Sequence, residues 1–411
     1  SPMRPRRRPK VQIRVEPRMT LLLASVTGSR EAELAVTHGA DIIDLKDPSQ
    51  GALGALELSV VCDAVSTIAG RRSTSAVIGD LPMEPGAIAA AVAATAKTGV
   101  DFVKVGLFAG SKRKECIRAL ASFARRTKVV GVMFADSEPD NELISLMAES
   151  GFAGAMMDTA RKDGKRLLDH ADPAAIDCFV RGCRSKGLLT GLAGSLEAAD
   201  VPRLLLLAPD YLGFRGALCD QHDRRAGLDP AELKLIRGLI PQDPRNVQAE
   251  RPEQKKRDYW ALAARGYFGE PKDDTAVDRV LVQDFEIPVR VGAYENERSH
   301  PQRVRFNVNA EVARAAKPAQ DMRDVLSYDI ITDGIRLIGA EGHIPLLETF
   351  AERVATLLLD HPQVQRVTVK IEKVEIGSGR VGVEITRQRA ASVAKIFHLF
   401  PTAAGKRGPA D

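Results

Sequence analysis

Eight short apolar segments, each followed by a longer segment of helical pattern, constrain the fold of this chain more than any other feature of its sequence. The apolar segments lie at residues 20–26, 40–46, 73–80, 101–107, 128–136, 152–159, 187–194 and 210–216. Strands that alternate with helices in this way indicate parallel βα units. Eight such units favour a closed (β/α)8 TIM barrel over an open doubly wound sheet.

The pattern changes after residue 240. A polar stretch at 241–258 is typical of a linker, and residues 259–271 are consistent with a short helix and turn. Long strands are expected at 279–292, 303–314, 364–373 and 380–388, with an amphipathic helix at 343–362. Two long hairpins around helices predict a smaller α+β domain with antiparallel strands. We therefore expect a basic tail at 1–18, a barrel domain at 19–240, a linker at 241–276, a second domain at 277–390 and a C-terminal tail at 391–411.

Composition limits the kinds of partner. The formal net charge of +5 comes from the segment 1–18, which carries +6 and which we expect to be disordered or a non-native extension. The remainder is about −1 and gives no support to nucleic-acid binding. No apolar run reaches the roughly 18–20 residues of a membrane span, and no signal peptide is evident. The five cysteines form no C-x-x-C pair, which fits reduced thiols in the cytoplasm and argues against a zinc site.

Charged residues gather at the ends of the apolar segments, and the carboxyl ends of barrel strands form the active site. They are Asp44, Lys46, Asp80, Lys104, Asp136, Asp158 and Lys162. Lys104 is informative because it interrupts "FVKVGL", and a buried parallel strand normally carries no charge. An amine that is partly desolvated and crowded by other cations loses its proton more readily and can attack a carbonyl. Nearby carboxylates can then move protons. This pattern predicts Schiff-base chemistry, with Lys46 as the expected imine-forming residue and Lys104 as the alternative.

Two glycine-bearing turns predict an anion site. "AGS" at 193–195 follows the seventh segment and "RGA" at 215–217 follows the eighth, where barrels of this class usually bind phosphate. Small residues allow backbone N–H groups to approach phosphate oxygens, and an arginine can add a bidentate contact. The predicted phosphate-binding residues are Gly194, Ser195, Arg215 and Gly216.

Several motifs in the barrel half resemble one known family. "ADIIDLKDPSQGALGA", "GDLPMEPG", "DFVKVGL", "MMDTARKDGKRLLDH", "LAGS" and "GFRGALCD" are similar to (5-formylfuran-3-yl)methyl phosphate synthase of methanofuran biosynthesis. The resemblance covers roughly residues 19–240. It implies a class I aldolase-like lyase that condenses two molecules of glyceraldehyde 3-phosphate into a furan aldehyde phosphate without a metal or other cofactor. By the same resemblance Lys46 forms the Schiff base and Lys104 acts as acid and base, with Asp44, Asp158 and Lys162 in the same cluster.

Two alternatives to the furan synthase stay open for the barrel. One is a different Schiff-base aldolase that acts on a triose or sugar phosphate. The other is a barrel that binds a phosphorylated ligand without turnover.

The second domain resembles dihydroneopterin aldolase over about residues 277–389. The motifs are "VRVGAYENERSHPQRVRFNV", "VLSYDI", "IPLLETFAERVA" and "VTVKIEK". The resemblance implies a tunnelling fold that assembles into rings, hence a homo-oligomer, with sites at the subunit interfaces. Carried over by motif, Glu297, Tyr328 and Lys373 occupy catalytic positions and Glu348 anchors a pterin. "VEIGSG" after Lys373 departs from the proline-bearing turn of many family members and puts the substrate fit in doubt.

Two hypotheses therefore compete for the second domain. It is either an active retro-aldolase that cleaves the side chain of a dihydropterin, or a scaffold that holds the barrel in an oligomer.

Overall fold

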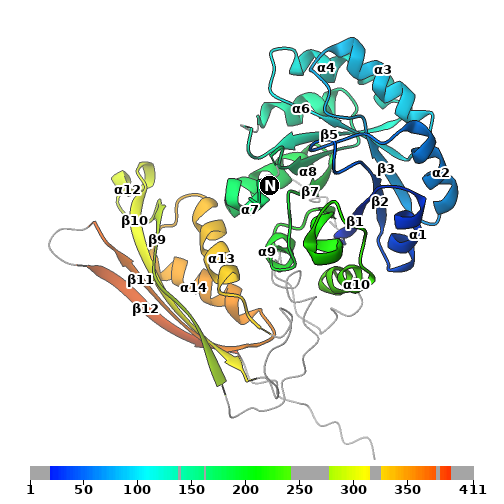
Figure 1. The fold of residues 1–411 in the computed structure, drawn as a ribbon. Helices are drawn as coiled ribbons and strands as arrows, with labels where there is room; N and C mark the ends of the chain where they lie inside the picture. Colours follow the sequence, from blue (N-terminus) through cyan, green and yellow to red (C-terminus); the bar gives the residue numbers. More distant parts are fainter. Residues whose placement is uncertain are drawn as a thin grey trace, which may run out of the picture.

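Eight parallel strands close into a barrel in the N-terminal half of the chain (Figure 1). The computed structural model describes residues 19–137, 140–161, 163–241, 277–314, 325–375 and 380–389. The strands are β1 (Leu21–Val26), β2 (Ile42–Leu45), β3 (Ser73–Val77), β4 (Phe102–Gly106), β5 (Lys128–Phe134), β6 (Gly154–Asp158), β7 (Leu189–Leu192) and β8 (Tyr211–Phe214). Each pairs with its neighbours in sequence, and β8 pairs with β1. The predicted TIM barrel is confirmed.

Helices surround the barrel because the chain must return across it between parallel strands. They are α1 (Ser29–Thr37), α2 (Leu58–Ile68), α3 (Pro85–Ala96), α4 (Arg113–Ala119), α5 (Ala121–Ala124), α6 (Glu142–Glu149), α7 (Leu167–His170), α8 (Pro173–Ser185), α9 (Asp200–Leu205) and α10 (Pro230–Leu239). Two short 3-10 turns, η1 (Gly216–Leu218) and η2 (Asp220–His222), follow β8. Both faces of the strands are buried, which explains their continuous apolar runs.

The register of the strands brings polar side chains together inside the barrel. Asp44 of β2 pairs with Ser25 of β1 and with Ser75 of β3, and Val77 of β3 pairs with Lys104 of β4. Side chains two residues apart point to the same face of a strand. Leu23 and Val77 lie in the apolar cluster that fills the barrel, so the residues in phase with them also point inward. A polar layer therefore lies within an otherwise apolar interior.

A separate four-stranded antiparallel sheet forms the C-terminal half, with strand order β12-β11-β10-β9. Its elements are β9 (Val277–Val289), α12 (Glu295–Ser299), β10 (Gln302–Ala313), α13 (Tyr328–Ala340), α14 (Leu347–Leu359), β11 (Val364–Lys373) and β12 (Val381–Gln388). Helices α13 and α14 cover one face of the sheet (Figure 1). The predicted α+β domain is confirmed, although its sequence pattern did not delimit α13.

The two halves are in contact. Helix α13 of the second domain packs against α8 and α9 of the barrel (Figure 1). The predicted tail 1–18, linker residues 242–276 and the C-terminal segment from residue 390 lie outside the described residues. Among the helices in the described ranges, none has the length and apolar character to cross a membrane.

Candidate active site

A buried ion pair joins strands β2 and β4 inside the barrel. Nζ of Lys104 lies 2.7 Å from Oδ1 of Asp44. The hydroxyl groups of Ser25 and Ser75 donate to the carboxylate of Asp44 at 3.1 and 2.5 Å. All four side chains are buried. The sequence predicted that Asp44 and Lys104 share one end of the barrel, and the structure places them in direct contact.

The charge of this pair is set by its surroundings. Burial alone would raise the pKa of Asp44, but the positive charges of Lys104 and Lys46 outweigh it, so the pKa of Asp44 is lowered. Asp44 is therefore a carboxylate at neutral pH and can accept a proton. Burial, together with the charge of Asp44, raises the pKa of Tyr211 in β8, so its phenol stays protonated.

Lys46 lies directly after β2, two residues beyond Asp44 and on the same face. Its backbone N–H donates to the carbonyl oxygen of Val26 at 3.1 Å, which continues the β1–β2 pairing. Lys46 is 8% exposed and Lys104 is 2% exposed. Lys46 is thus the lysine nearer to the open end of the barrel, and its charge acts on the same carboxylate as that of Lys104.

Asp158 ends β6 on the inner side of the barrel. It pairs with Phe134, which belongs to the apolar cluster of the barrel interior, and it is 2% exposed. Its carboxylate accepts a hydrogen bond from the backbone N–H of Thr159 at 2.7 Å. Lys162, predicted for the same cluster, lies outside the described residues.

Asp80 and Asp136, which were expected at the mouth of the barrel, hold loops there. The carboxylate of Asp80 accepts from the N–H groups of Ala52 and Leu53 at 2.9 and 2.8 Å. Asp136 accepts from two N–H groups of the loop after β6, at residues 160 and 161. Since both oxygens of Asp80 are engaged by backbone, this arrangement favours a role in positioning the β2 loop over the predicted role in proton transfer.

Arg215, which was predicted to bind phosphate, contacts a carboxylate in the structure. Its guanidinium forms an ion pair with Glu31, with Nη1 2.6 Å from the carboxylate. The other N–H groups donate to the carbonyl oxygens of Ser25, Arg224 and Ala226. A guanidinium has five N–H donors, and these contacts with both oxygens of Glu31 use them all. No donor of Arg215 is left for a phosphate oxygen.

The turn after β7 retains the features expected of an anion site. Gly194 has φ +119°, and a Cβ there would lie 2.9 Å from a side-chain carbon of Thr159. Ser195 also has a positive φ, of 49°, and is exposed. Gly216 begins η1 beyond β8. The backbone therefore makes a tight left-handed turn at the mouth of the barrel, where only a residue without a Cβ fits position 194.

Sequence reasoning missed Arg224, which follows η2. Its Nη2 donates to the carbonyl oxygen of Gly51 in the β2 loop at 3.1 Å. Burial lowers the pKa of Arg224 although the charges of Asp158 and Asp80 oppose this effect. Arg224 is therefore a half-buried cation beside the loops that carry the candidate site. The only sequence signal was a second arginine in "DRRAG", which is common in exposed loops.

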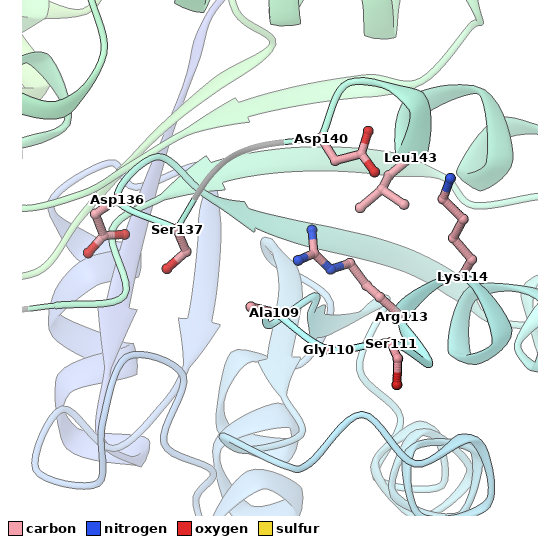
Figure 2. A pocket seen from close by; sticks show the side chains of 9 residues that line it. All are labelled: Ala109, Gly110, Ser111, Arg113, Lys114, Asp136, Ser137, Asp140 and Leu143. Carbon is pink, nitrogen blue, oxygen red and sulfur yellow. The ribbon is translucent and has the colours of Figure 1, made fainter.

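An open cavity of about 620 Å3 lies beside the strand ends of β4 and β5 (Figure 2). Arg113 at the start of α4 extends into it, and its Nε donates to the carbonyl oxygen of Phe108 at 3.1 Å. Asp136 and Ser137 form the wall on the β5 side. Neither Lys46 nor Lys104 lines this cavity.

A second ion pair marks the other domain. Nζ of Lys373, at the end of β11, lies 2.5 Å from Oε1 of Glu297 in α12, and both side chains are largely buried. The other oxygen of Glu297 accepts from the backbone N–H of Tyr294 at 3.0 Å. The hydrogen bond from Lys373 lowers the pKa of Glu297. The structure thus brings together two of the four residues predicted for a pterin site.

The other two predicted residues lie at the beginnings of helices. Tyr328 opens α13 and is 62% exposed, and Glu348 lies in the first turn of α14 and is also exposed. Within the described residues, neither side chain forms a hydrogen bond or ion pair with Glu297 or Lys373. Among the described residues, no group of three or more His, Cys, Asp or Glu side chains is placed to hold a metal ion.

These observations define a barrel with a buried lysine–aspartate centre, joined to a smaller antiparallel domain with a lysine–glutamate pair. The family model described as 4-HFC-P synthase matches residues 22–237, which is more than half of the chain, and the model described as dihydroneopterin aldolase matches residues 280–386. The chain therefore belongs to the (5-formylfuran-3-yl)methyl phosphate synthase family and carries a dihydroneopterin aldolase-like domain.

Each half of the chain is similar to known proteins. A Methanopyrus kandleri (5-formylfuran-3-yl)methyl phosphate synthase is 39% identical over 233 residues, which are 53% of this chain and 98% of that protein. A Methylorubrum extorquens protein that carries the same name provisionally is 46% identical over 212 residues, 52% of this chain and 88% of its own. A solved structure of E. coli dihydroneopterin aldolase in complex with neopterin is 29% identical and covers 27% of this chain and 98% of its own, with a TM-score of 0.25.

Proposed function

We propose that the barrel condenses two molecules of glyceraldehyde 3-phosphate into (5-formylfuran-3-yl)methyl phosphate through a Schiff base on Lys46. The observation that carries the proposal is the buried pair of Lys104 and Asp44 directly below Lys46. Two amines and a carboxylate in one desolvated site supply a nucleophile and a proton shuttle. The names of the relatives support the identity of the product.

Position in the barrel favours Lys46 over Lys104 as the nucleophile. Lys46 lies directly after β2, nearer to the open end of the barrel, where a triose can enter. Lys104 lies deeper, within β4, and contacts Asp44 at 2.7 Å.

The proposed reaction balances without an oxidant or reductant. The amine of Lys46 attacks the aldehyde carbon of one triose and water leaves. Removal of a proton from the adjacent carbon by Asp44 gives an enamine, which expels the phosphate of this triose. The carbon that has lost the phosphate then forms the new C–C bond with the carbonyl carbon of the second triose, after that triose has isomerised from aldehyde to ketone. Ring closure with loss of water follows, with Lys104 returning protons. Hydrolysis releases Lys46, so that the net products are the furan aldehyde phosphate, one phosphate and two waters.

Borohydride trapping tests this proposal. Incubation of the full chain with glyceraldehyde 3-phosphate and borohydride should reduce the imine and place a covalent adduct on Lys46, located by peptide mass spectrometry. Lys46→Met should abolish the adduct, whereas Lys186→Met, at an exposed position after α8, should leave it unchanged. If neither an adduct nor an ultraviolet-absorbing furan forms, the proposal is wrong. An adduct without a furan would favour a different class I aldolase.

We further propose that the second domain is a retro-aldolase for a dihydropterin with a hydroxylated side chain. The pair of Lys373 and Glu297 favours this activity because it places an ammonium and a carboxylate in contact in a largely buried position. Such a pair can remove a proton from a substrate hydroxyl and protonate the carbon that is left after C–C cleavage. Tyr328 and Glu348 remain candidates for the site if a second subunit of a homo-oligomer brings them near it.

The full chain incubated with 7,8-dihydroneopterin should release glycolaldehyde and 6-hydroxymethyl-dihydropterin. Lys373→Met should abolish this release, and Lys370→Met, in the same strand but paired with Glu372, should not. A ring assembly in solution without any pterin turnover would favour the scaffold hypothesis instead.

A further inference from the structure

A buried ion pair connects the two domains. Arg203 of α9 contacts Asp333 of α13 with both ends of its guanidinium, Nε to Oδ2 at 2.6 Å and Nη2 to Oδ1 at 3.1 Å. Arg203 is 14% exposed and Asp333 is 1% exposed. Arg336, one turn further along α13, also contacts Asp333 at 3.1 Å. A bidentate, desolvated pair fixes both position and orientation of the two helices.

The same helix α9 also carries a buried carboxylate. Asp200 lies three residues before Arg203 and is therefore on the same side of the helix. Asp200 is fully buried. Its Oδ2 accepts from the backbone N–H of Glu197 at 2.9 Å, and its Oδ1 accepts from Nη1 of Arg166 at 3.2 Å. Arg203, which binds α9 to the second domain, is thus one helical turn from Asp200, which binds the preceding loop.

This loop begins at the predicted anion turn. We call residues 194–199, between β7 and α9, the β7 loop. Arg166 precedes Leu167, whose backbone N–H donates to the carbonyl oxygen of Gly194 at 2.9 Å. Helix α9 therefore joins two sets of contacts: Arg203 binds Asp333 of the second domain, and Asp200 binds the loop at Glu197 and, through Arg166, the segment that contacts Gly194.

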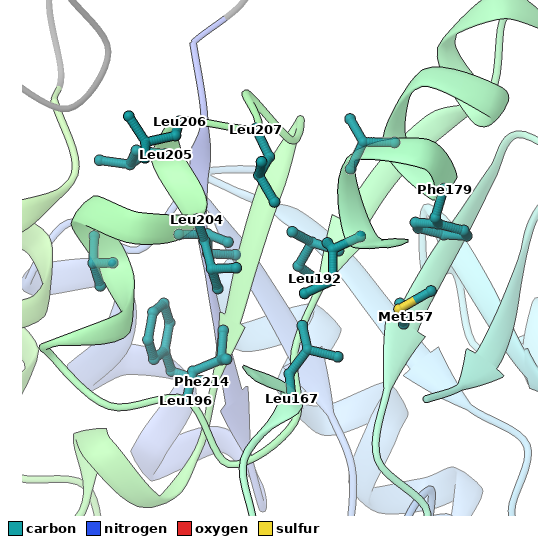
Figure 3. Close-up of a cluster of buried hydrophobic side chains, with 14 of the residues drawn as sticks. Met157, Leu167, Phe179, Leu192, Leu196, Leu204, Leu205, Leu206, Leu207 and Phe214 are labelled. Atoms are coloured by element: carbon teal, nitrogen blue, oxygen red, sulfur yellow. The ribbon is translucent and has the colours of Figure 1, made fainter. Parts of the chain in front are cut away.

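Apolar packing makes α9 and the β7 loop move together. Figure 3 shows Leu196 of the loop and Leu204 of α9 in one cluster with Leu192 of β7. All three are buried, and close-packed side chains transmit displacement because they leave no space to relax into. A shift of α9 relative to the second domain would therefore displace the turn at Gly194.

We propose that Asp333 is a positioning residue for the β7 loop, so that docking of the second domain sets the geometry of the anion-binding turn of the barrel. The contact is a feature of this two-domain chain, because 98% of the M. kandleri relative is matched by 53% of this chain. The kinetic consequence rests on the proposed function, since it assumes that Gly194 and Ser195 bind a substrate phosphate. The structural consequence, a loop ordered by the second domain, does not.

The test compares full-length variants on both sides of the interface. In Asp333→Asn and Arg203→Met, the amides of residues 194–199 should exchange with deuterium about tenfold faster than in the parent chain. The KM for glyceraldehyde 3-phosphate should rise about fivefold with kcat changed less than twofold, because the loop binds but does not react. Arg203→Lys keeps the positive charge but not the bidentate guanidinium. Its exchange rates and KM should lie between those of the parent chain and those of Arg203→Met.

Asp278→Asn is the matched control. Asp278 belongs to the second domain and contacts Arg314 at 2.9 Å, but both side chains are more than half exposed. It should change neither exchange nor KM. If Asp333→Asn unfolds the second domain, Arg203→Met decides, because Arg336 still neutralises Asp333 in that variant. Exchange of the β7 loop and KM both within twofold of the parent in a folded variant would overturn the proposal. If the parent chain does not turn over glyceraldehyde 3-phosphate, the proposed function is wrong. The exchange rates of the β7 loop still test whether Asp333 positions this loop.

Discussion

The Nζ of Lys104 and the Oδ1 of Asp44 lie 2.7 Å apart in a part of the barrel that water barely reaches. Removing two charges from water is costly, and their attraction offsets this cost only when both partners are present. The hydroxyls of Ser25 and Ser75 satisfy further lone pairs of the carboxylate. Such a pair adds little net stability, because the cost of burying both charges offsets their attraction.

Replacing one partner of this pair should cost more stability than replacing both. We expect Asp44→Asn to lower the free energy of unfolding by about 3–5 kcal/mol, since it leaves the charge of Lys104 buried and uncompensated. The double variant Asp44→Leu, Lys104→Met should lose less than either single variant, although furan synthesis is abolished in all of them. Denaturant unfolding measures these differences. Glu142→Gln, which breaks an exposed pair with Lys114, should leave the free energy of unfolding close to that of the parent. Additive losses in the double variant would contradict the prediction.

Arg215 should be required for the fold and not for phosphate affinity. Arg215→Met removes the ion pair with Glu31 and leaves three carbonyl oxygens without their donor. We expect it to lower the free energy of unfolding by about 3–5 kcal/mol. The affinity of the folded variant for inorganic phosphate, measured by calorimetry under stabilising conditions, should equal that of the parent. A selective loss of phosphate affinity in a stable Arg215→Met variant would restore the sequence prediction.

Asp80 should act through the β2 loop. In Asp80→Asn one of the two carboxylate acceptors becomes a donor that faces a backbone N–H, so we expect a loss of about 1–3 kcal/mol in stability. Turnover should fall at every pH by a similar factor, because Asp80 holds the loop in place and transfers no proton. A pH–rate profile measures this. Loss of one limb of the profile would show instead that Asp80 transfers a proton.

The second domain should lose stability in mild acid because of His361. Burial, and to a smaller extent the charge of Arg389, lowers the pKa of His361 to about 3. An unfolded histidine has a pKa near 6.5, so between about pH 6.5 and pH 3 the unfolded state binds a proton that the folded state does not. Stability should therefore be unaffected by this group above about pH 6.5 and fall below it, by at most about 1.4 kcal/mol per pH unit.

Thermal unfolding of the full chain across this pH range measures the effect. His361→Phe should weaken the pH dependence of the unfolding temperature of the second domain. His300→Gln, at an exposed position in the same domain, should not change it. An unchanged slope in a folded His361→Phe variant would exclude His361 as the source.

The barrel and the lysine pair could be predicted because their signals are local. A strand that is buried on both faces has a continuous run of apolar residues. In a helix that packs on it, apolar residues recur with a period near 3.6. Lys104 was visible because it breaks one such run. Its position on the inner face follows from the same period of two that places Asp44 and Lys46 on one side of β2.

The partners of several charged side chains could not be predicted from the sequence. Arg215 was correctly placed at a strand end, but its partner Glu31 lies 184 residues earlier, where β1 meets β8 only after the barrel closes. The contact between Arg203 and Asp333 spans 130 residues and two domains. No local pattern encodes such contacts, because the same arginine at the same strand end can face an anion, a carbonyl oxygen or a carboxylate.

The sequence by itself thus determined the kinds of elements, their order, the closed barrel, the antiparallel second domain and the resemblance to two families. Only the tertiary structure decided which charged groups meet: Lys104 with Asp44, Arg215 with Glu31, Lys373 with Glu297, and Arg203 with Asp333. The physical reason is that periodicity depends on neighbours along the chain, whereas an ion pair depends on distance and burial, which exist only once remote segments have packed together.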